Sequence, residues 1–179
     1  MNALGTRIIK KTIAQLLLLP LWYMTAHAGV VDSPVPALQA GSGAAVVFTA
    51  TGVVQLLNLE TVFMCTSLEK TKTVRVGVEV FGSNGGTPLN DLSASGSDPG
   101  NGAVDLPPGS TATIVTGNTA EFLQDATILF LPGLKNGSAR IVSTSPKITC
   151  NAFLTDKLHT PPNSLLPLRL LRGSSQKGD

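Results

Sequence analysis

Valine recurs at every second position over residues 74–81, and this pattern constrains the fold more than any other part of the chain. Val74, Val76, Val78 and Val80 alternate with Arg, Gly and Glu side chains. A two-residue period is typical of a β-strand, because successive side chains point to opposite faces of a sheet. We therefore predict a strand whose valine face is buried in the core.

Other short β-prone runs are separated by turn-forming residues at intervals of about ten residues. They cover residues 46–50, 53–57, 61–66, 103–106, 111–116, 126–131, 138–143 and 147–154. No helical pattern longer than a turn or two interrupts them. This spacing predicts an all-β fold, namely an antiparallel immunoglobulin-like β-sandwich of about 7–9 strands.

Two hairpins are expected among these strands. The first joins residues 61–66 to residues 74–81 through a polar turn. The second joins residues 138–143 to residues 147–154 through Thr144-Ser145-Pro146. Each hairpin would place two consecutive strands side by side in one sheet.

Residues 1–28 predict export. A basic stretch precedes an apolar run over residues 13–24 that ends in Ala26-His27-Ala28, as in a cleavable signal peptide. A transmembrane anchor is the alternative, but spanning a bilayer takes about 20 apolar residues, and this run is shorter. We expect a secreted or periplasmic protein that begins at Gly29 and has no membrane span.

Removing residues 1–28 changes the composition of the chain. That segment contains the only Trp, the only Tyr, one of two His and three of thirteen basic residues. Residues 29–156 then carry six basic and ten acidic side chains, which predicts no nucleic-acid partner, because nucleic-acid binders show basic faces interleaved with aromatics. Residues 29–156 are expected to form one β-sandwich domain.

Residues 157–179 form a basic tail that contains Pro and Leu, with four basic residues and one acidic residue. We expect this tail to be largely extended or disordered. Its leucines between residues 165 and 171 offer one possible docking stretch.

Two cysteines, Cys65 and Cys150, remain after residue 28. In an oxidising compartment an even pair far apart in sequence usually forms a disulfide. We predict this disulfide and expect it to connect the two sheets of the sandwich. The alternative is a pair of separate buried thiols.

Residues 82–102 contain six glycines and no sustained apolar pattern, which predicts a long surface loop and a first candidate for a binding surface. Asp91, Asp98, Asn101 and Asp105 lie in or near it, and oxygen ligands on loops suit calcium. Because no EF-hand pattern accompanies them, solvated turn residues are the default interpretation. No metal and no cofactor are predicted.

Two sequence features could indicate a catalytic site. Ser67-Leu68-Glu69-Lys70 matches the Ser-x-x-Lys of serine β-lactamases, but it falls in an expected β-turn, which favours coincidence. His159 is the one imidazole available for a Ser-His-Asp site, and it precedes Thr160-Pro161-Pro162 at the edge of the tail. No catalytic residue is predicted.

Five short segments carry a resemblance that extends over most of residues 29–179: residues 63–68, 76–81, 106–109, 137–145 and 150–154. They look like a group of small, uncharacterised secreted bacterial β-sandwich proteins. The resemblance implies the fold and the compartment, and it brings no catalytic, metal or binding residue.

The first functional hypothesis is a non-enzymatic module that binds a protein or glycan partner, or has a structural role, in the periplasm or outside the cell. Its contact surfaces would be residues 82–102 and the tail, and deleting residues 82–102 should then spare the fold. An exported hydrolase using Asp98 and Asp105 is one alternative. A subunit of a surface polymer is another.

Overall fold

The computed structural model describes residues 29–38, 43–92, 101–117, 124–128, 134–159 and 161–173, and every regular element among them is a β-strand. The strands are β1 Ala45–Gln55, β2 Leu59–Ser67, β3 Val74–Phe81, β4 Ala103–Leu106, β5 Thr111–Val115, β6 Ala126–Thr127, β7 Leu134–Ser143, β8 Ile148–Asp156, β9 Leu165–Leu168 and β10 Leu170–Arg172. The predicted all-β class is confirmed for this part of the chain. The predicted signal peptide, residues 1–28, lies outside it.

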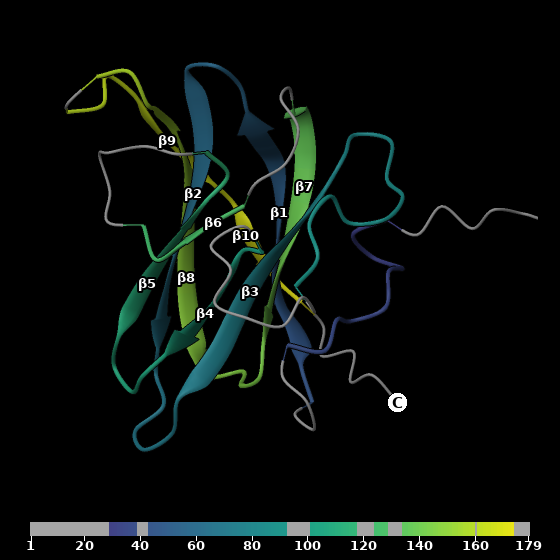
Figure 1. The fold of residues 1–179 in the computed structure, drawn as a ribbon, viewed down its shortest axis with the longest axis vertical. Helices are drawn as coiled ribbons and strands as arrows, with labels where there is room; N and C mark the ends of the chain where they lie inside the picture. The colour runs from purple at the N-terminus through teal and green to yellow at the C-terminus, as the bar shows by residue number, and fades with distance from the viewer. Residues whose placement is uncertain are drawn as a thin grey trace, which may run out of the picture.

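Strand pairing divides the sheet into two halves. The first half-sheet has the order β4-β3-β7-β1-β10, and the second has the order β6-β5-β2-β8-β9. Figure 1 shows β2, β5, β8 and β9 on the left of the view and β1, β3 and β7 on the right. All of these pairs are antiparallel except β5 with β6, which is parallel. The sheet is therefore mixed, and the expectation of a purely antiparallel sheet is wrong at this pair.

Two connections nearly close the sheet. At one end Gln55 of β1 pairs with Glu60 of β2. At the other, β9 pairs with β8 while β10 pairs with β1, and only Arg169 separates β9 from β10. One extended segment thus leaves the second half-sheet and joins the first.

The main core is built from the strand that the sequence marks most clearly. Val74, Val76, Val78 and Val80 of β3 are all buried, as predicted. They belong to one apolar cluster with Phe63 of β2 and with residues of β5, β7 and β8. Both half-sheets therefore contribute side chains to a common core.

A second, smaller apolar cluster lies on the other face of β3. Leu38, Leu92, Ala103 and Val142 form it. A Cβ atom added at Gly77 of β3 would lie 2.8 Å from Leu92 Cδ1. Glycine at this position therefore lets Leu92 pack directly on the strand.

Arg140 of β7 anchors the chain before β1 to this same face. It lies opposite Glu79 of β3 in the strand register, and both side chains are buried. Arg140 Nε donates to Glu79 Oε2, Nη1 donates to the carbonyl oxygen of Ser33 at 2.6 Å, and Nη2 donates to the carbonyl oxygen of Pro34. The guanidinium group thus joins two strands and the N-terminal segment 29–38.

Both predicted hairpins are wrong. β2 pairs with β5 and β8, while β3 pairs with β4 and β7, so the connection between β2 and β3 passes from one half-sheet to the other. The connection between β7 and β8 does the same. These two crossovers contact each other, since Ser145 Oγ donates to Glu69 Oε1 at 2.6 Å. Lys72 and Lys147 also lie 3.4 Å and 3.5 Å from the Glu69 carboxylate.

The described part of the tail is extended, which is one of the two states expected for it. Residues 165–168 and 170–172 are the paired strands β9 and β10, so this part of the tail extends the sheet instead of being disordered. These two strands raise the total to ten, above the expected number. The division into a domain over residues 29–156 and a tail over residues 157–179 stays a prediction.

Candidate binding groove at the open edge of β8

The described parts of the predicted loop 82–102 fold back onto β3. Asn90 is buried, and its side chain accepts from the N–H of Val80 at 2.9 Å and donates to the carbonyl oxygen of Val78 at 2.8 Å. Leu92 is buried in the second cluster. The described part of this stretch therefore supplies core, which argues against the expectation that it can be deleted without loss of the fold. Residues 93–100 lie outside the described part.

Asp105 and Asn101, two of the residues considered for calcium or hydrolysis, each have a partner of their own in the described structure. Asp105 of β4 faces its register partner Arg75 of β3, with Oδ1 3.1 Å from Nη1. Asn101 is buried, and its Oδ1 accepts from the N–H of Ala103 at 2.9 Å. Asp98 lies outside the described residues. The residues that are described include no group of three or more His, Cys, Asp or Glu able to hold a metal ion.

The Ser-x-x-Lys motif does not bring its serine and lysine together. Ser67 is buried at the end of β2, and its Oγ accepts from the N–H of Glu69 at 3.3 Å. Lys70 is exposed in the crossover that follows. The interpretation of this motif as a coincidence agrees with that geometry.

His159 has a partner that the sequence pattern did not reveal. Its Nδ1 lies 2.7 Å from Asp156 Oδ2. Asp156 also accepts from the N–H of Leu158 at 2.7 Å and from the N–H of Asn163 at 3.1 Å, and these bonds lower the pKa of its carboxyl group. Asp156 therefore shapes the connection between β8 and β9.

A groove of about 600 Å³ opens where β9 leaves β8. Most of its lining is apolar, with Phe48 from β1, Met64 from β2 and Phe153 from β8 among the larger side chains. Leu165, Pro167, Leu168 and Leu170 of the crossing tail complete the apolar wall, and Thr149, Cys150, Asn151 and Ala152 line the β8 side. The groove therefore depends on strands from both half-sheets.

Half of β8 has a paired neighbour on one side only. β2 pairs with the whole of β8, whereas β9 pairs only with residues 152–155. Along residues 148–151, the described chain places no strand beside the second edge of β8. These residues form the open edge of β8, and the groove lies along residues 149–151 of this edge, since Ile148 is buried and does not line it.

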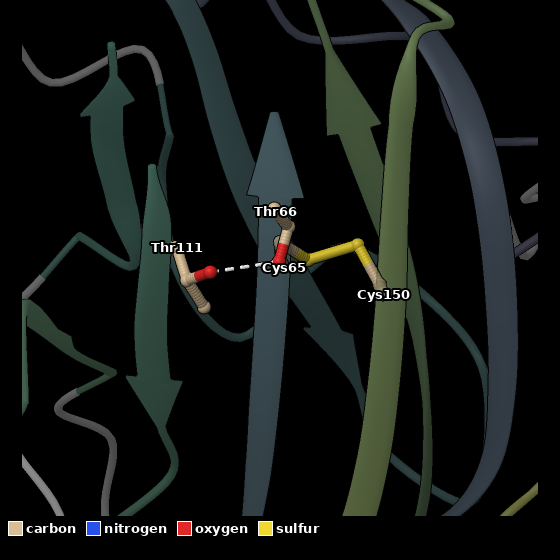
Figure 2. Close-up of a disulfide and its surroundings, with 4 residues drawn as sticks. All are labelled: Cys65, Thr66, Thr111 and Cys150. Atoms are coloured by element: carbon tan, nitrogen blue, oxygen red, sulfur yellow. Dashed lines mark hydrogen bonds between the residues drawn. A yellow bond between two sulfur atoms is a disulfide. The ribbon is translucent and has the colours of Figure 1, made fainter. Parts of the chain in front are cut away.

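The cysteine pair shows which backbone groups face this edge. Figure 2 shows Cys65 of β2 joined to Cys150 of β8 by the predicted disulfide. Their Cα atoms are 4.1 Å apart, the close spacing of a pair that exchanges no backbone hydrogen bonds. The N–H and C=O groups of Cys150 therefore point away from β2, and the same holds for Ile148 two residues earlier.

The expected location of the disulfide between two sheets is wrong. Cys65 and Cys150 are register partners on adjacent strands of the second half-sheet. Figure 2 also shows the other neighbour of β2, where Thr66 Oγ1 lies 2.8 Å from Thr111 Oγ1 of β5. The disulfide thus fastens two strands that already pair with each other.

The charge at the rim of the groove is positive. The Arg172 guanidinium carbon lies 6.0 Å from the centre of the Phe48 ring, which lines the groove. Arg172 is exposed, as is Arg169 between β9 and β10. None of the residues that line the groove is acidic. The groove therefore combines an apolar lining with a cationic rim.

A buried carboxyl group lies elsewhere on β2. Among the described residues, neither oxygen of Glu60 has a hydrogen-bond partner. Gly117 packs so closely that an added Cβ atom would lie 2.2 Å from Glu60 Oε2. Burial raises the pKa of Glu60 to about 7, and the positive charge of Lys157 opposes that shift.

Comparison with protein-family models, with curated proteins and with solved structures found no match to this chain. The resemblance to small secreted β-sandwich proteins therefore stays a prediction. Among the described residues there is no helix long and apolar enough to cross a membrane.

Proposed function

We propose that this chain is an exported, non-enzymatic binding module, an immunoglobulin-like β-sandwich that acts in the periplasm or outside the cell. The observation that carries the binding function is the groove beside β8, with its apolar lining and cationic rim. Small-ligand and peptide sites are concave and mostly apolar, with a few polar groups that orient the ligand.

Two further features support the compartment and the architecture. A disulfide persists in oxidising compartments and is rare in the cytosol, so the Cys65–Cys150 bond agrees with export. The common core shared by the two half-sheets supports a sandwich. The leader-like pattern of residues 1–28 is the independent sequence argument for export.

Binding of the dye 8-anilinonaphthalene-1-sulfonate tests whether the groove takes a ligand. The dye combines apolar rings with an anionic group, which matches the lining and Arg172. Leu165 lines the groove and is 56% exposed, whereas Leu171 is 48% exposed and does not line it. We expect saturable binding that Leu165→Asp weakens by about fivefold, which corresponds to about 1 kcal/mol of apolar contact.

Leu171→Asp is the matched control, because it adds the same charge to the same tail outside the groove. Its affinity for the dye should stay within about twofold of the wild type. Equal weakening by both substitutions, or no saturable binding at all, would show that the groove is not a ligand site.

A further inference from the structure

We propose that the groove receives an extended peptide segment, which pairs with the open edge of β8 as an added strand and directs a carboxylate toward Arg172. This inference rests on the proposed binding function and adds the chemical class of the ligand. Three properties of the site support it: the backbone groups at the edge of β8, the apolar lining of the groove and the positive charge of Arg172.

The backbone of β8 offers the hydrogen-bonding pattern of a sheet edge. The N–H and C=O groups of Ile148 and Cys150 point away from β2. An extended peptide can pair with Cys150, which lines the groove, because strands add to exposed edges through main-chain hydrogen bonds. Ile148 is 3% exposed and does not line the groove, so the pairing starts beyond it. Glycans and lipids lack the alternating N–H and C=O groups that such an edge selects.

The chain itself shows that this edge accepts a strand. β9 pairs with β8 in antiparallel register from Thr155↔Leu165 to Ala152↔Leu168. At Arg169 the tail turns away and joins β1 as β10. A bound peptide would occupy the place that β9 leaves vacant, and about three residues at roughly 3.3 Å each would span residues 149–151.

The walls of the groove indicate which side chains such a peptide carries. Phe48 and Leu170 line it together with Cys150, while Met64 and Phe153 line it from neighbouring positions on β2 and β8. Apolar side chains at alternate positions of the peptide would enter this lining. A carboxylate at the rim would meet the Arg172 guanidinium, which recognises carboxylates through its planar set of donors.

Selection from a displayed library of random octapeptides tests the proposal with the purified protein. Enriched peptides are expected to alternate apolar residues and to contain Asp or Glu. Arg172→Glu should reverse the charge preference, so that Lys or Arg replaces Asp or Glu among the enriched peptides. Lys135→Glu is the matched control: Lys135 is exposed on β7 and does not line the groove, so the enriched peptides should stay acidic.

The best enriched peptide is then synthesised in two N-methylated versions. One version is methylated at the odd-numbered residues and the other at the even-numbered residues. In one of the two versions the methyl groups replace the N–H donors that point to β8. That version should bind at least about tenfold more weakly, the effect of losing roughly 1.4 kcal/mol. Failure to enrich any peptide, equal binding of the two N-methylated versions, or an unchanged charge preference in Arg172→Glu overturns the proposal.

Dye binding distinguishes failure of the peptide proposal from failure of the proposed binding function. If the dye still binds in the groove while no peptide is enriched, the groove is a ligand site for another class, such as a glycan, and the peptide assignment is wrong. Self-association of the protein that is competed by the dye would identify a second copy as the occupant, and this too would overturn the assignment.

Discussion

Glu60 is a buried carboxyl group to which none of the described residues donates a hydrogen bond. It lies on β2 opposite Thr155 of β8, with both oxygens buried and without a hydrogen bond. A buried charge without a partner is unfavourable, so burial raises the pKa of Glu60 to about 7. The consequence is a contribution to stability that depends on pH.

Glu60→Gln should therefore stabilise the protein in alkaline solution and change little in acid. The Glu60 pKa is about 7 in the folded protein and 4.5 as its ordinary value. Between these values the unfolded chain releases the proton that the folded protein keeps, so the stability of the wild type falls as pH rises through this window. Above this window the wild type is destabilised by the full difference, about 3 kcal/mol.

Urea unfolding of both proteins at pH 4 and pH 8 measures this difference. Glu69→Gln is the control, since the hydrogen bond from Ser145 lowers the pKa of Glu69. That substitution should destabilise the protein at pH 8, opposite in sign to Glu60→Gln. A Glu60→Gln effect of equal size at both pH values would contradict the interpretation.

Among the elements, the N-terminal segment 29–38 is held to the sheet by Arg140 and by the packing of Leu38 in the second cluster. Arg140 donates to the carbonyl oxygens of Ser33 and Pro34 while it pairs with Glu79. Burial favours the neutral form of Glu79 and raises its pKa, and Arg140 opposes that effect. The buried ion pair therefore positions a segment that has no strand partner of its own.

Arg140→Met should release this segment. It leaves Glu79 buried without its cation and should cost about 3–5 kcal/mol of unfolding free energy. Limited proteolysis should then cleave within residues 29–38 earlier than in the wild type. Arg75→Met breaks the more exposed pair with Asp105 and should cost no more than about 1 kcal/mol; equal protection of the segment in both variants would refute its anchoring by Arg140.

The strands were largely predictable from sequence because alternation is a local signal. β3 was predicted with its bounds, since its valines repeat without interruption. β1 was expected as two runs around Gly52, but it is one strand with irregular register at that point. Gly52 has a φ of 79°, which lets the strand continue through a bulge.

The pairing of the strands and the location of the groove were not predictable in this way. A polar connection such as residues 68–73 looks the same whether it returns in one sheet or crosses to the other. Burial of Glu69 and its bond from Ser145 show the crossing, and both depend on residues about 75 positions apart in the chain. The leucines of the tail were the one sequence feature near the groove that suggested a contact surface. Their pairing with β8 and β1 depends on tertiary contacts, which the local sequence does not reveal.

At the scale of the whole molecule, the disulfide connects residues 85 positions apart. Closing so long a loop restricts the unfolded chain, and disulfides of this kind contribute about 2–4 kcal/mol. The double variant Cys65→Ala/Cys150→Ala should therefore lose about that amount in urea unfolding. The reduced wild type should behave similarly, and an unchanged midpoint in both would contradict the expected stabilisation.

The arrangement around β1 also has a kinetic consequence. β1 pairs along most of its length with β7 and, at residues 48–50, with β10, so both partners are synthesised long after it. Contacts so distant in sequence slow folding, and β-rich domains of this kind fold in milliseconds to seconds. During that interval the edges of β1 and β8 are not yet paired with the tail. The β10 segment of one molecule can then pair with β1 of another molecule before it pairs with β1 of its own chain. Dilution during refolding would therefore favour the monomer over a strand-exchanged dimer.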